Sequence, residues 1–365
     1  METQVMALPT TMKAAVMTDL HQIELQELPV PELGLRDVLV KVMAVGACGS
    51  DVHYFDHGRI GQHVVEKPLI LGHECAGVVV ALGADVSRFQ IGDRVAIEPG
   101  VTCGRCDMCK SGRYNLCKDV EFLATPPCDG AFAQYIRHRE DFLFPIPDTL
   151  TFEAAALVEP LSVGIHACKR ARVAPGSSVA IFGMGPVGLM TVVAAKFFRA
   201  AEIYVADLEP VRLEAALKLG ATRAFNVGSE DAVAEILRLT NHVGVDVAIE
   251  TAGNPIALQN SLATVRRGGA LAIVGLPAQD EIPLNVPLIS SYEVDIHGIF
   301  RYANTYPLGI KLLSSGEFDV DHLITDRYPL EQTQAALERA LTNKSGTLKV
   351  MIYPHGYESG TGCWT

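Results

Sequence analysis

The chain has 365 residues, of which 49% are hydrophobic and 20% charged, and its formal net charge is −12. These values are typical of a globular protein with two domains, because a single core usually stops growing at roughly 250–300 residues. The negative charge argues against a nucleic-acid or anionic-membrane partner, both of which attract basic surfaces. The first residues hold no signal-peptide pattern, and no apolar stretch reaches the roughly 20 residues of a membrane span. The sequence therefore predicts a cytoplasmic protein.

Short apolar runs dominate the first part of the chain, residues 1–160. They are rich in Val, Ile and Ala, and Gly, Pro and Asp separate them at a spacing typical of a small barrel or sandwich. We therefore expect a mainly β domain there, with strands that include Val38–Val42, Ala76–Ala81 and Arg94–Ile97.

From about Leu161, expected strands alternate with expected helices. This alternation indicates βαβ units and a parallel sheet. We predict an α/β fold in which residues 161–300 form a Rossmann-type doubly wound sheet. The expected strands are 178–183, 202–207, 245–253, 269–276 and 294–300, and the expected helices are Leu189–Ala200 and Val211–Leu219, the second capped by Gly220.

The last part of the chain adds a helix at Leu330–Leu341 and a strand at Leu348–Tyr353. The tail after this strand, residues 355–365, is small and polar. Such a composition predicts a disordered terminus.

A glycine-rich turn follows the first strand of the expected parallel sheet. Gly183, Gly185 and Gly188 form the pattern G-x-G-x-x-G, with Pro186 and Val187 before the last Gly, and this segment leads into the next expected helix. The first Gly permits a tight turn, the second lets a pyrophosphate approach the backbone, and the third lets the helix pack on the strand. The helix N-terminus offers free N–H groups to the phosphates. The setting predicts a dinucleotide site, and a glycine-rich turn without a ligand is the alternative.

Asp207 ends the second expected strand of this sheet, nineteen residues after Gly188. A carboxylate at that position would bond to the ribose hydroxyls and would repel a 2′-phosphate, so NAD is predicted over NADP. Arg212 could lie along the adenosine, or it could be an ordinary helix-surface residue.

Four of the nine cysteines cluster in one short segment, at Cys103, Cys106, Cys109 and Cys117. Four thiolates can close a tetrahedral zinc shell with no open position, which is a structural site. The surrounding lobe, residues 100–118, has little apolar content, so the metal would serve as its core. Chance clustering of free thiols is the alternative. An odd cysteine count without an export signal argues against a disulfide framework.

A second group of metal ligands is dispersed along the chain. Cys48, His73 and Glu74 are all proper zinc ligands, and three protein ligands leave one position open for water or substrate. An open position is the mark of a catalytic site. Glu159, which lies among apolar residues, is a fourth candidate that could ligate the metal directly or bond to its water. Each residue alone is more often structural, so their combination carries the prediction.

The pattern G-H-E-x2-G at residues 72–77, followed by Gly83 and Val86, resembles the zinc signature of the medium-chain alcohol dehydrogenases. The resemblance covers about residues 13–354. Within that superfamily the chain is similar to the sorbitol dehydrogenase group, which includes xylitol and L-arabinitol dehydrogenases. The segments similar to this group are 50–54, 122–127, 159–164 and 300–302, whereas Cys128 stands where the group often has Asp.

This resemblance implies a GroES-like catalytic domain over residues 1–160, to which residues 301–365 return, and a Rossmann domain across a cleft from it. It implies reversible, zinc-dependent oxidation of a polyol such as sorbitol or xylitol to the ketose, with NAD as the hydride acceptor. It also implies one catalytic and one structural zinc ion in each chain, and usually a homotetramer.

The group's site residues carry over position by position. Cys48, His73 and Glu74 match the catalytic zinc ligands, and Glu159 matches their water-bridged or labile fourth partner. Polyol contacts are expected from Tyr54, Phe122, Glu159, Arg301 and Tyr302, and NAD contacts from Val187, Asp207, Arg212, Val274, Gly275, Leu276, Ile299, Phe300 and Arg301.

Ser50 and His53 follow Cys48 by two and five residues, a spacing that resembles the proton relay of the alcohol dehydrogenases. A Ser hydroxyl can pass a proton, and His can exchange one with solvent near neutral pH. The alternative is that Ser50 is a turn residue and His53 a surface residue, and a water beside Glu159 is a competing proton route. For Arg301 the alternative is a structural ion pair with a carboxylate.

Two other functions compete with polyol oxidation. An L-threonine or 2,3-butanediol dehydrogenase is the enzymatic rival, and Tyr54 and residues 300–302 argue against it. A non-catalytic NAD-binding relative is the other, but such a protein could lose Cys48, His73 or Glu74, and all three are intact.

Overall fold

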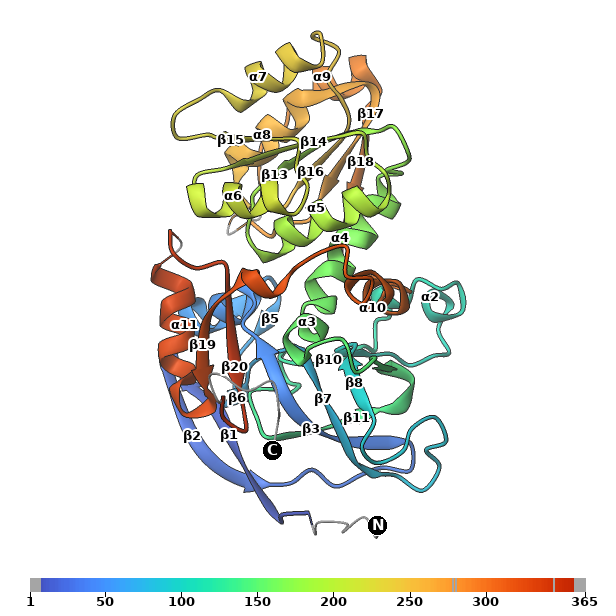
Figure 1. Cartoon of the computed structure of the whole chain (residues 1–365), viewed down its shortest axis with the longest axis vertical. Coiled ribbons are helices and arrows are strands. Elements are labelled where there is room, and N and C mark those ends of the chain that lie inside the picture. Colours follow the sequence, from blue (N-terminus) through green and yellow to red (C-terminus); the bar gives the residue numbers. More distant parts are fainter. Residues whose placement is uncertain (1–7, 278, 280, 344, 358–365) are drawn as a thin grey trace.

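Two large sheets organise the chain (Figure 1). The structure is a computed structural model that describes residues 8–277, 279, 281–343 and 345–357. One sheet is six-stranded and wholly parallel, and the other is seven-stranded and draws strands from both the N-terminal and the C-terminal parts of the chain.

The parallel sheet has the strand order β15-β14-β13-β16-β17-β18. This is the doubly wound order in which the chain reverses direction beside its first strand, and ligands bind at that point. The strands are β13 (Ser178–Phe182), β14 (Glu202–Asp207), β15 (Arg223–Asn226), β16 (Val245–Glu250), β17 (Val265–Ile273) and β18 (Asp295–Gly298). The predicted α/β class is confirmed, and the expected strands end up to three residues later than the observed ones.

Helices cover both faces of the parallel sheet (Figure 1). Side chains of β13 alternate between the two faces, so Val179 and Ile181 pack against α5 and α6, whereas Ala180 and Phe182 pack on the opposite side with α7 and α8. The helices are α5 (Pro186–Phe197), α6 (Pro210–Lys218), α7 (Ala232–Leu239), α8 (Pro255–Thr264) and α9 (Val286–Tyr292).

The seven-stranded sheet has the order β12-β8-β7-β3-β20-β19, with β11 also paired to β3. Its strands are β3 (Asp37–Gly46), β7 (Glu74–Leu82), β8 (Arg94–Ile97), β11 (Tyr135–Arg139), β12 (Leu143–Pro145), β19 (Ile324–Pro329) and β20 (Lys349–Tyr353). A smaller sheet beside it has the order β2-β1-β6, from β1 (Thr11–Asp19), β2 (Gln22–Pro29) and β6 (Leu69–Ile70). Helix α11 (Thr333–Thr342) packs on β19 and β20.

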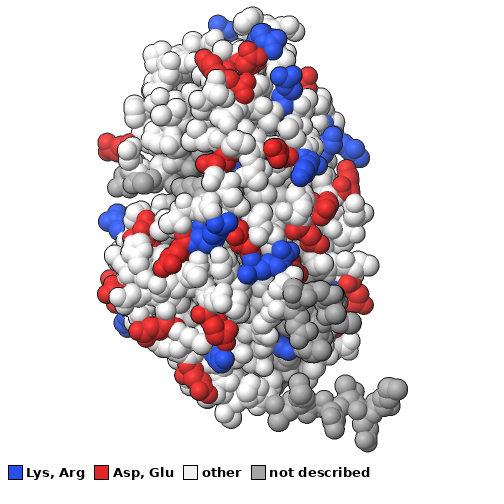
Figure 2. All heavy atoms as spheres, turned by 60° about the vertical axis from the view of Figure 1, so that its left-hand side comes forward, with Lys and Arg blue, Asp and Glu red and all other residues white. Residues whose placement is uncertain are grey.

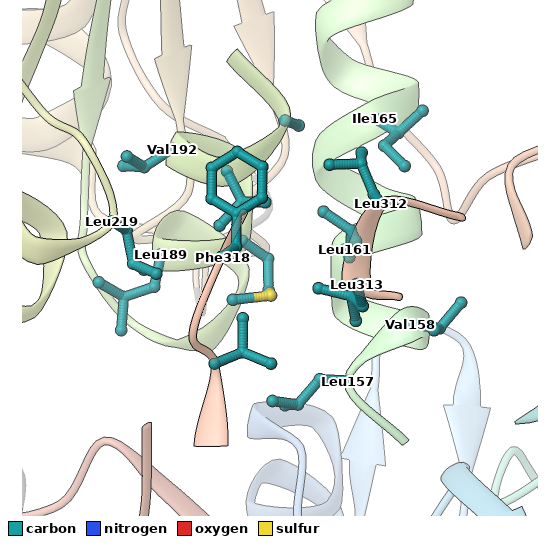
Figure 3. Close-up of a cluster of buried hydrophobic side chains, with 14 of the residues drawn as sticks. Leu157, Val158, Leu161, Ile165, Leu189, Val192, Leu219, Leu312, Leu313 and Phe318 are labelled. Carbon is teal, nitrogen blue, oxygen red and sulfur yellow. The ribbon is translucent and has the colours of Figure 1, made fainter. Parts of the chain in front are cut away.

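Helix α4 (Val158–Arg170) connects the two sheets and contains residues 160 and 161, where the sequence predicted the change of domain. It packs against α5 and α10 (Tyr306–Leu313), and α3 (Phe152–Ala156) just before it packs on β3 and β7. Figure 3 shows the apolar side chains at this junction, which are Leu157, Val158, Leu161, Ile165, Leu189, Val192, Leu219, Leu312, Leu313 and Phe318. A shared core of this kind fixes the two sheets relative to each other.

The chain after β20 corrects the expectation of a disordered tail at residues 355–357. His355 is half-buried, with Nε2 2.9 Å from the carbonyl oxygen of Gln134, and the Tyr357 ring lies 4.8 Å from the Tyr353 ring. These contacts order a polar segment whose composition alone gave no sign of them. Residues 358–365 of the predicted tail lie outside the described residues.

Acidic and basic side chains are interspersed on the face shown in Figure 2. Acidic residues outnumber basic ones, 42 to 30. Within the part of the chain that the structure describes, no helix is long and apolar enough to cross a membrane.

Candidate active site

Cys48, His73 and Glu74 come together where β3 and β7 lie side by side. Cys48 precedes α1 (Gly49–His57), Glu74 is the first residue of β7, and His73 lies directly before it. One potential ligand atom from each residue lies within 4.8 Å of the other two. His73 and Glu74 are buried, and Cys48 is half-buried. The structure thus assembles the three dispersed residues that the sequence proposed as metal ligands.

Asp51 supports two sides of this ligand group. Its carboxylate is fully buried, and it accepts hydrogen bonds from the backbone N–H groups of Cys48 and Gly72, both at 2.9 Å. It also lies 3.5 Å from Nδ1 of His73. Burial would lower the pKa of the His73 imidazole, but Asp51 and the Cys48 thiol outweigh burial and raise this pKa well above its ordinary value. The surroundings of His73 therefore favour positive charge at this position, and a bound metal cation would provide such a charge.

Lys349 of β20 supports the third ligand. Its side chain is 2% exposed, its amine contacts Oε2 of Glu74, and the same amine donates a hydrogen bond to the carbonyl oxygen of Ala47 at 2.9 Å. A Cβ atom on Gly46 would lie 2.4 Å from the Glu74 carboxylate and 2.6 Å from Cε of Lys349. Only glycine therefore leaves room for this ion pair.

Glu159 lies beside the ligand group but is not part of it. Among the described residues, the group of potential ligand atoms within 4.8 Å holds Cys48, His73 and Glu74 without Glu159. The Tyr302 hydroxyl instead donates to Oε1 of Glu159 at 2.8 Å. Burial raises the pKa of Glu159 to about 7. One carboxylate oxygen of Glu159 is thus bonded to Tyr302, and direct ligation of the metal and contact through its water both stay predictions.

Arg301 lies between two aromatic rings next to this site. Its guanidinium carbon is 3.8 Å from the centre of the Phe122 ring and 4.8 Å from that of Phe300. The Phe122 ring is in turn 5.7 Å from the His73 ring. Nη1 of Arg301 is buried without a hydrogen-bond partner. No carboxylate in the described residues forms an ion pair with Arg301, so the structural alternative finds no support.

Tyr54 lies on α1 and is buried. Burial raises the pKa of its hydroxyl, and the nearby Arg301 partly opposes this shift. The expected polyol contacts Tyr54, Phe122, Arg301 and Tyr302 therefore lie around the metal-ligand group.

Ser50 and His53 both lie on α1, and both are half-buried. The His53 ring lies 5.6 Å from that of His57. Their placement on the helix that begins after Cys48 is compatible with a proton relay, which stays a prediction.

The four clustered cysteines form a second candidate metal site. Their sulfur atoms lie within 4.8 Å of one another, with Cys106 to Cys109 at 3.5 Å and Cys103 to Cys109 at 4.0 Å. Tetrahedral Zn–S bonds of about 2.3 Å place sulfur atoms about 3.8 Å apart, so the spacing fits zinc. Hydrogen bonds from the N–H groups of Arg105 and Cys106 lower the pKa of the Cys103 thiol to about 6, which favours the thiolate that a metal needs.

The glycine-rich turn lies between β13 and α5, at the reversal point of the parallel sheet. Gly183 has φ +95°, and a Cβ there would meet the backbone N of Ala252 at 2.7 Å. A Cβ on Gly188 would lie 1.9 Å from the carbonyl oxygen of Gly183. Gly185 differs, since a Cβ there would meet nothing within 4 Å. The open space lies at the N-terminus of α5, where a pyrophosphate would fit.

Asp207 ends β14 beside this turn. Oδ2 accepts the N–H of Met184 at 2.5 Å, and Oδ1 accepts the N–H of Glu209 at 2.9 Å. Arg212 on α6 has its Nε buried without a hydrogen-bond partner. The remaining expected NAD contacts lie at the start of α5 and after β17 and β18. Pro186, Val187, Val274 and Gly275 are half-buried, Leu276 and Phe300 are exposed, and Ile299 is buried.

Sequence reasoning missed Asp51 and Lys349 as functional residues. Asp51 stands at the third position of a helix after Cys48, where an acidic residue commonly bonds back to the residue before the helix. Lys349 is a single charge in an otherwise apolar strand, which is a sign of a buried partner.

Comparisons with known proteins agree with this geometry. The family model "Alcohol dehydrogenase GroES-like domain" matches residues 34–148, and "Zinc-binding dehydrogenase" matches residues 186–315. A sorbitol dehydrogenase of Bacillus subtilis is 65% identical over 347 residues, which are 95% of this chain and 98% of the relative. The chain belongs to the zinc-containing medium-chain alcohol dehydrogenases, in their sorbitol dehydrogenase group.

Solved structures of this superfamily have the same fold. An Escherichia coli oxidoreductase of unknown specificity, ECK1772, matches with a TM-score of 0.90 and 40% identity over 94% of this chain and 99% of that one. The 2R,3R-butanediol dehydrogenase of Bacillus subtilis matches with a TM-score of 0.85 and 32% identity, over 94% of this chain and 100% of that one. Membership of the alcohol dehydrogenase family therefore explains the GroES-like domain, the Rossmann domain and the use of zinc and a nicotinamide cofactor.

Proposed function

We propose that this protein oxidises a polyol such as sorbitol or xylitol to the corresponding ketose, reversibly, with NAD as the hydride acceptor. The observation that carries the proposal is the half-buried Arg301, whose buried Nη1 has no hydrogen-bond partner and whose guanidinium lies over the Phe122 ring beside His73. A buried donor without a partner is costly unless a ligand supplies an acceptor. A polyol has outer hydroxyls to offer, and a simple alcohol has none.

The residues of the site have different roles in the reaction. When bound, zinc supplies a Lewis acid that favours loss of the alcohol proton, and the nicotinamide accepts the hydride. Cys48, His73 and Glu74 would hold the zinc, and Asp51 and Lys349 orient them. Arg301 and Tyr302 would bond to the outer hydroxyls and fix the reacting carbon in place.

Two routes compete for the proton that leaves the alcohol. Glu159, with a pKa of about 7, can take up and release a proton near neutral pH. Ser50 and His53 offer the other route along α1. The hydrogen bond from Tyr302 to Glu159 favours the first route, because it links a proposed substrate contact to the proton acceptor.

We extend the proposal to cofactor choice, metal content and assembly. The Asp207 carboxylate beside the glycine turn supports NAD over NADP. The sulfur spacing of the four cysteines supports a structural zinc in addition to the catalytic one. A cytoplasmic homotetramer agrees with the resemblance to the sorbitol dehydrogenase group.

Butanediol dehydrogenase activity is the second candidate, since a solved butanediol dehydrogenase shares the fold at 32% identity. A single panel separates the two: NAD reduction with sorbitol, xylitol and L-arabinitol, with 2,3-butanediol and L-threonine in parallel. We expect kcat/KM to be highest for a polyol. A higher value for butanediol or threonine would overturn the proposal.

A further inference from the structure

The four-cysteine lobe contacts the segment that carries Arg301 and Tyr302. Nδ2 of Asn115 donates to the carbonyl oxygen of Phe300 at 2.8 Å. The backbone N–H of Asn304 donates to the Tyr114 hydroxyl at 2.7 Å, and Nδ2 of Asn304 donates to the carbonyl oxygen of Gly112 at 2.9 Å. These three hydrogen bonds span about 190 residues of sequence and bracket the two residues on both sides.

Tyr114 is itself held from the catalytic part of the molecule. Its hydroxyl donates to Oε1 of the buried Glu98 at 2.8 Å while it accepts the N–H of Asn304. Tyr114 and Asn115 lie in a short 3-10 helix, Tyr114–Leu116, between the third and fourth cysteines of the lobe. The direction of the Tyr114 hydroxyl is thus fixed by a group outside the lobe, and its position by the cysteines on either side.

The backbone of the bracketed segment needs such support. Arg301 and Asn304 have φ of 52° and 57°, in the left-handed region that Gly and Asn adopt more readily than Arg. Conformations of this kind persist where the surroundings hold them. Tyr114 and Asn115 from the lobe line one small cavity together with Arg301 and Tyr302 from the segment. The residues that support the segment therefore lie next to the residues that would contact the polyol.

We propose that the four-cysteine lobe determines polyol specificity, with Asn115 and Tyr114 as the positioning residues that set the backbone at 300–304. Asn115 fixes the Phe300 carbonyl, and with it the residue directly before Arg301. Tyr114 fixes the other end of the segment at Asn304. This inference rests on the proposed polyol function, because it assigns the lobe to the residues that would contact the outer hydroxyls.

The test compares two substrates that differ in those hydroxyls. In Asn115→Ala and Tyr114→Phe, kcat/KM should fall about tenfold for sorbitol, mainly through KM, and less than about twofold for propan-2-ol. Asn115→Asp, which places an acceptor against the Phe300 carbonyl, should lower sorbitol selectivity further. The stabilisation that sorbitol gives against thermal unfolding with NADH present should shrink in the same order, which is a readout without turnover.

The matched control lies in the same lobe. The Ser111 hydroxyl bonds to the carbonyl oxygen of Met108 within the lobe and, among the described residues, forms no hydrogen bond with Phe300 or Asn304, so Ser111→Ala should keep the wild-type ratio of the two kcat/KM values. Equal losses for both substrates in the Asn115 and Tyr114 variants, with zinc content unchanged, would mean general structural support and would overturn the inference alone. A wild-type enzyme without preference for sorbitol over propan-2-ol would overturn the proposed function and the inference together.

Discussion

The amine of Lys349 contacts the carboxylate of Glu74 although 275 residues separate them in sequence, and both side chains are buried. Groups that orient metal ligands typically contribute 10- to 100-fold to metal affinity or activity. Lys349→Met should therefore release the catalytic zinc about 10- to 100-fold faster to a chelator and lower kcat. Time-resolved zinc release measures this directly.

A surface ion pair provides the control for this charge removal. Lys13 and Glu331 lie 2.9 Å apart with about half of each side chain exposed, so Lys13→Met should leave zinc release unchanged. Lys349→Arg, which keeps the charge, should recover part of the loss. Wild-type release rates in Lys349→Met would contradict the role assigned to the ion pair.

Asp51 should affect turnover through the orientation of His73 and Cys48. Asp51→Asn keeps the side-chain size and removes the charge beside Nδ1 of His73. Its amide nitrogen cannot accept a hydrogen bond, so one of the two N–H bonds from Cys48 and Gly72 is lost. We expect kcat/KM for the polyol to fall by 10- to 100-fold with the circular dichroism spectrum unchanged. A variant within twofold of the wild type would show that Asp51 has no part in orienting His73.

Cofactor choice depends on the charge of Asp207. Asp207→Asn can still accept the Met184 N–H bond, so the turn should persist while the repulsion of a 2′-phosphate is lost. The ratio of kcat/KM for NAD to that for NADP should fall by at least tenfold. Glu209→Gln on the neighbouring residue should leave the ratio as it is. An unchanged ratio in Asp207→Asn would place the ribose elsewhere.

Glu98 gives the stability of the protein a defined pH dependence. Burial raises its pKa from 4.5 to about 7 in the folded state. Between these values the folded protein holds a proton on Glu98 that the unfolded chain has released. The contribution of Glu98 to the free energy of unfolding therefore falls as the pH rises from 4.5 to 7 and is constant above that. At about 1.4 kcal/mol per pH unit the loss amounts to about 3 kcal/mol.

Glu98→Gln removes this dependence. The Gln carbonyl can still accept the Tyr114 hydroxyl bond, so the comparison isolates the titration. The difference in free energy of unfolding between variant and wild type should grow in favour of the variant between pH 4.5 and 7. Parallel stability curves across that range would show that Glu98 titrates normally.

The parts of this account that the sequence predicted depend on local pattern or on residue type. The glycine turn follows from adjacent residues, and Cys48, His73 and Glu74 follow from their chemistry as ligands. The sequence did not predict α4. Pro160 lies in its first turn, where proline is tolerated, but proline in a sequence also suggests a break in a helix. Lys349 and Tyr114 act through partners 275 and 190 residues away, which no local pattern reveals. The commitment of Glu159 to Tyr302 is equally long-range.

We propose that Cys48, His73 and Glu74 hold the zinc on which polyol oxidation depends, at a site separate from the four cysteines. Zinc content and sorbitol turnover measured together on His73→Ala test it most directly. We predict a loss of one zinc ion per chain, retention of the four-cysteine zinc and turnover below about 1% of the wild type, since catalytic metal sites supply several kcal/mol to the transition state. Turnover near the wild-type rate, in a variant whose zinc loss is verified, would contradict it.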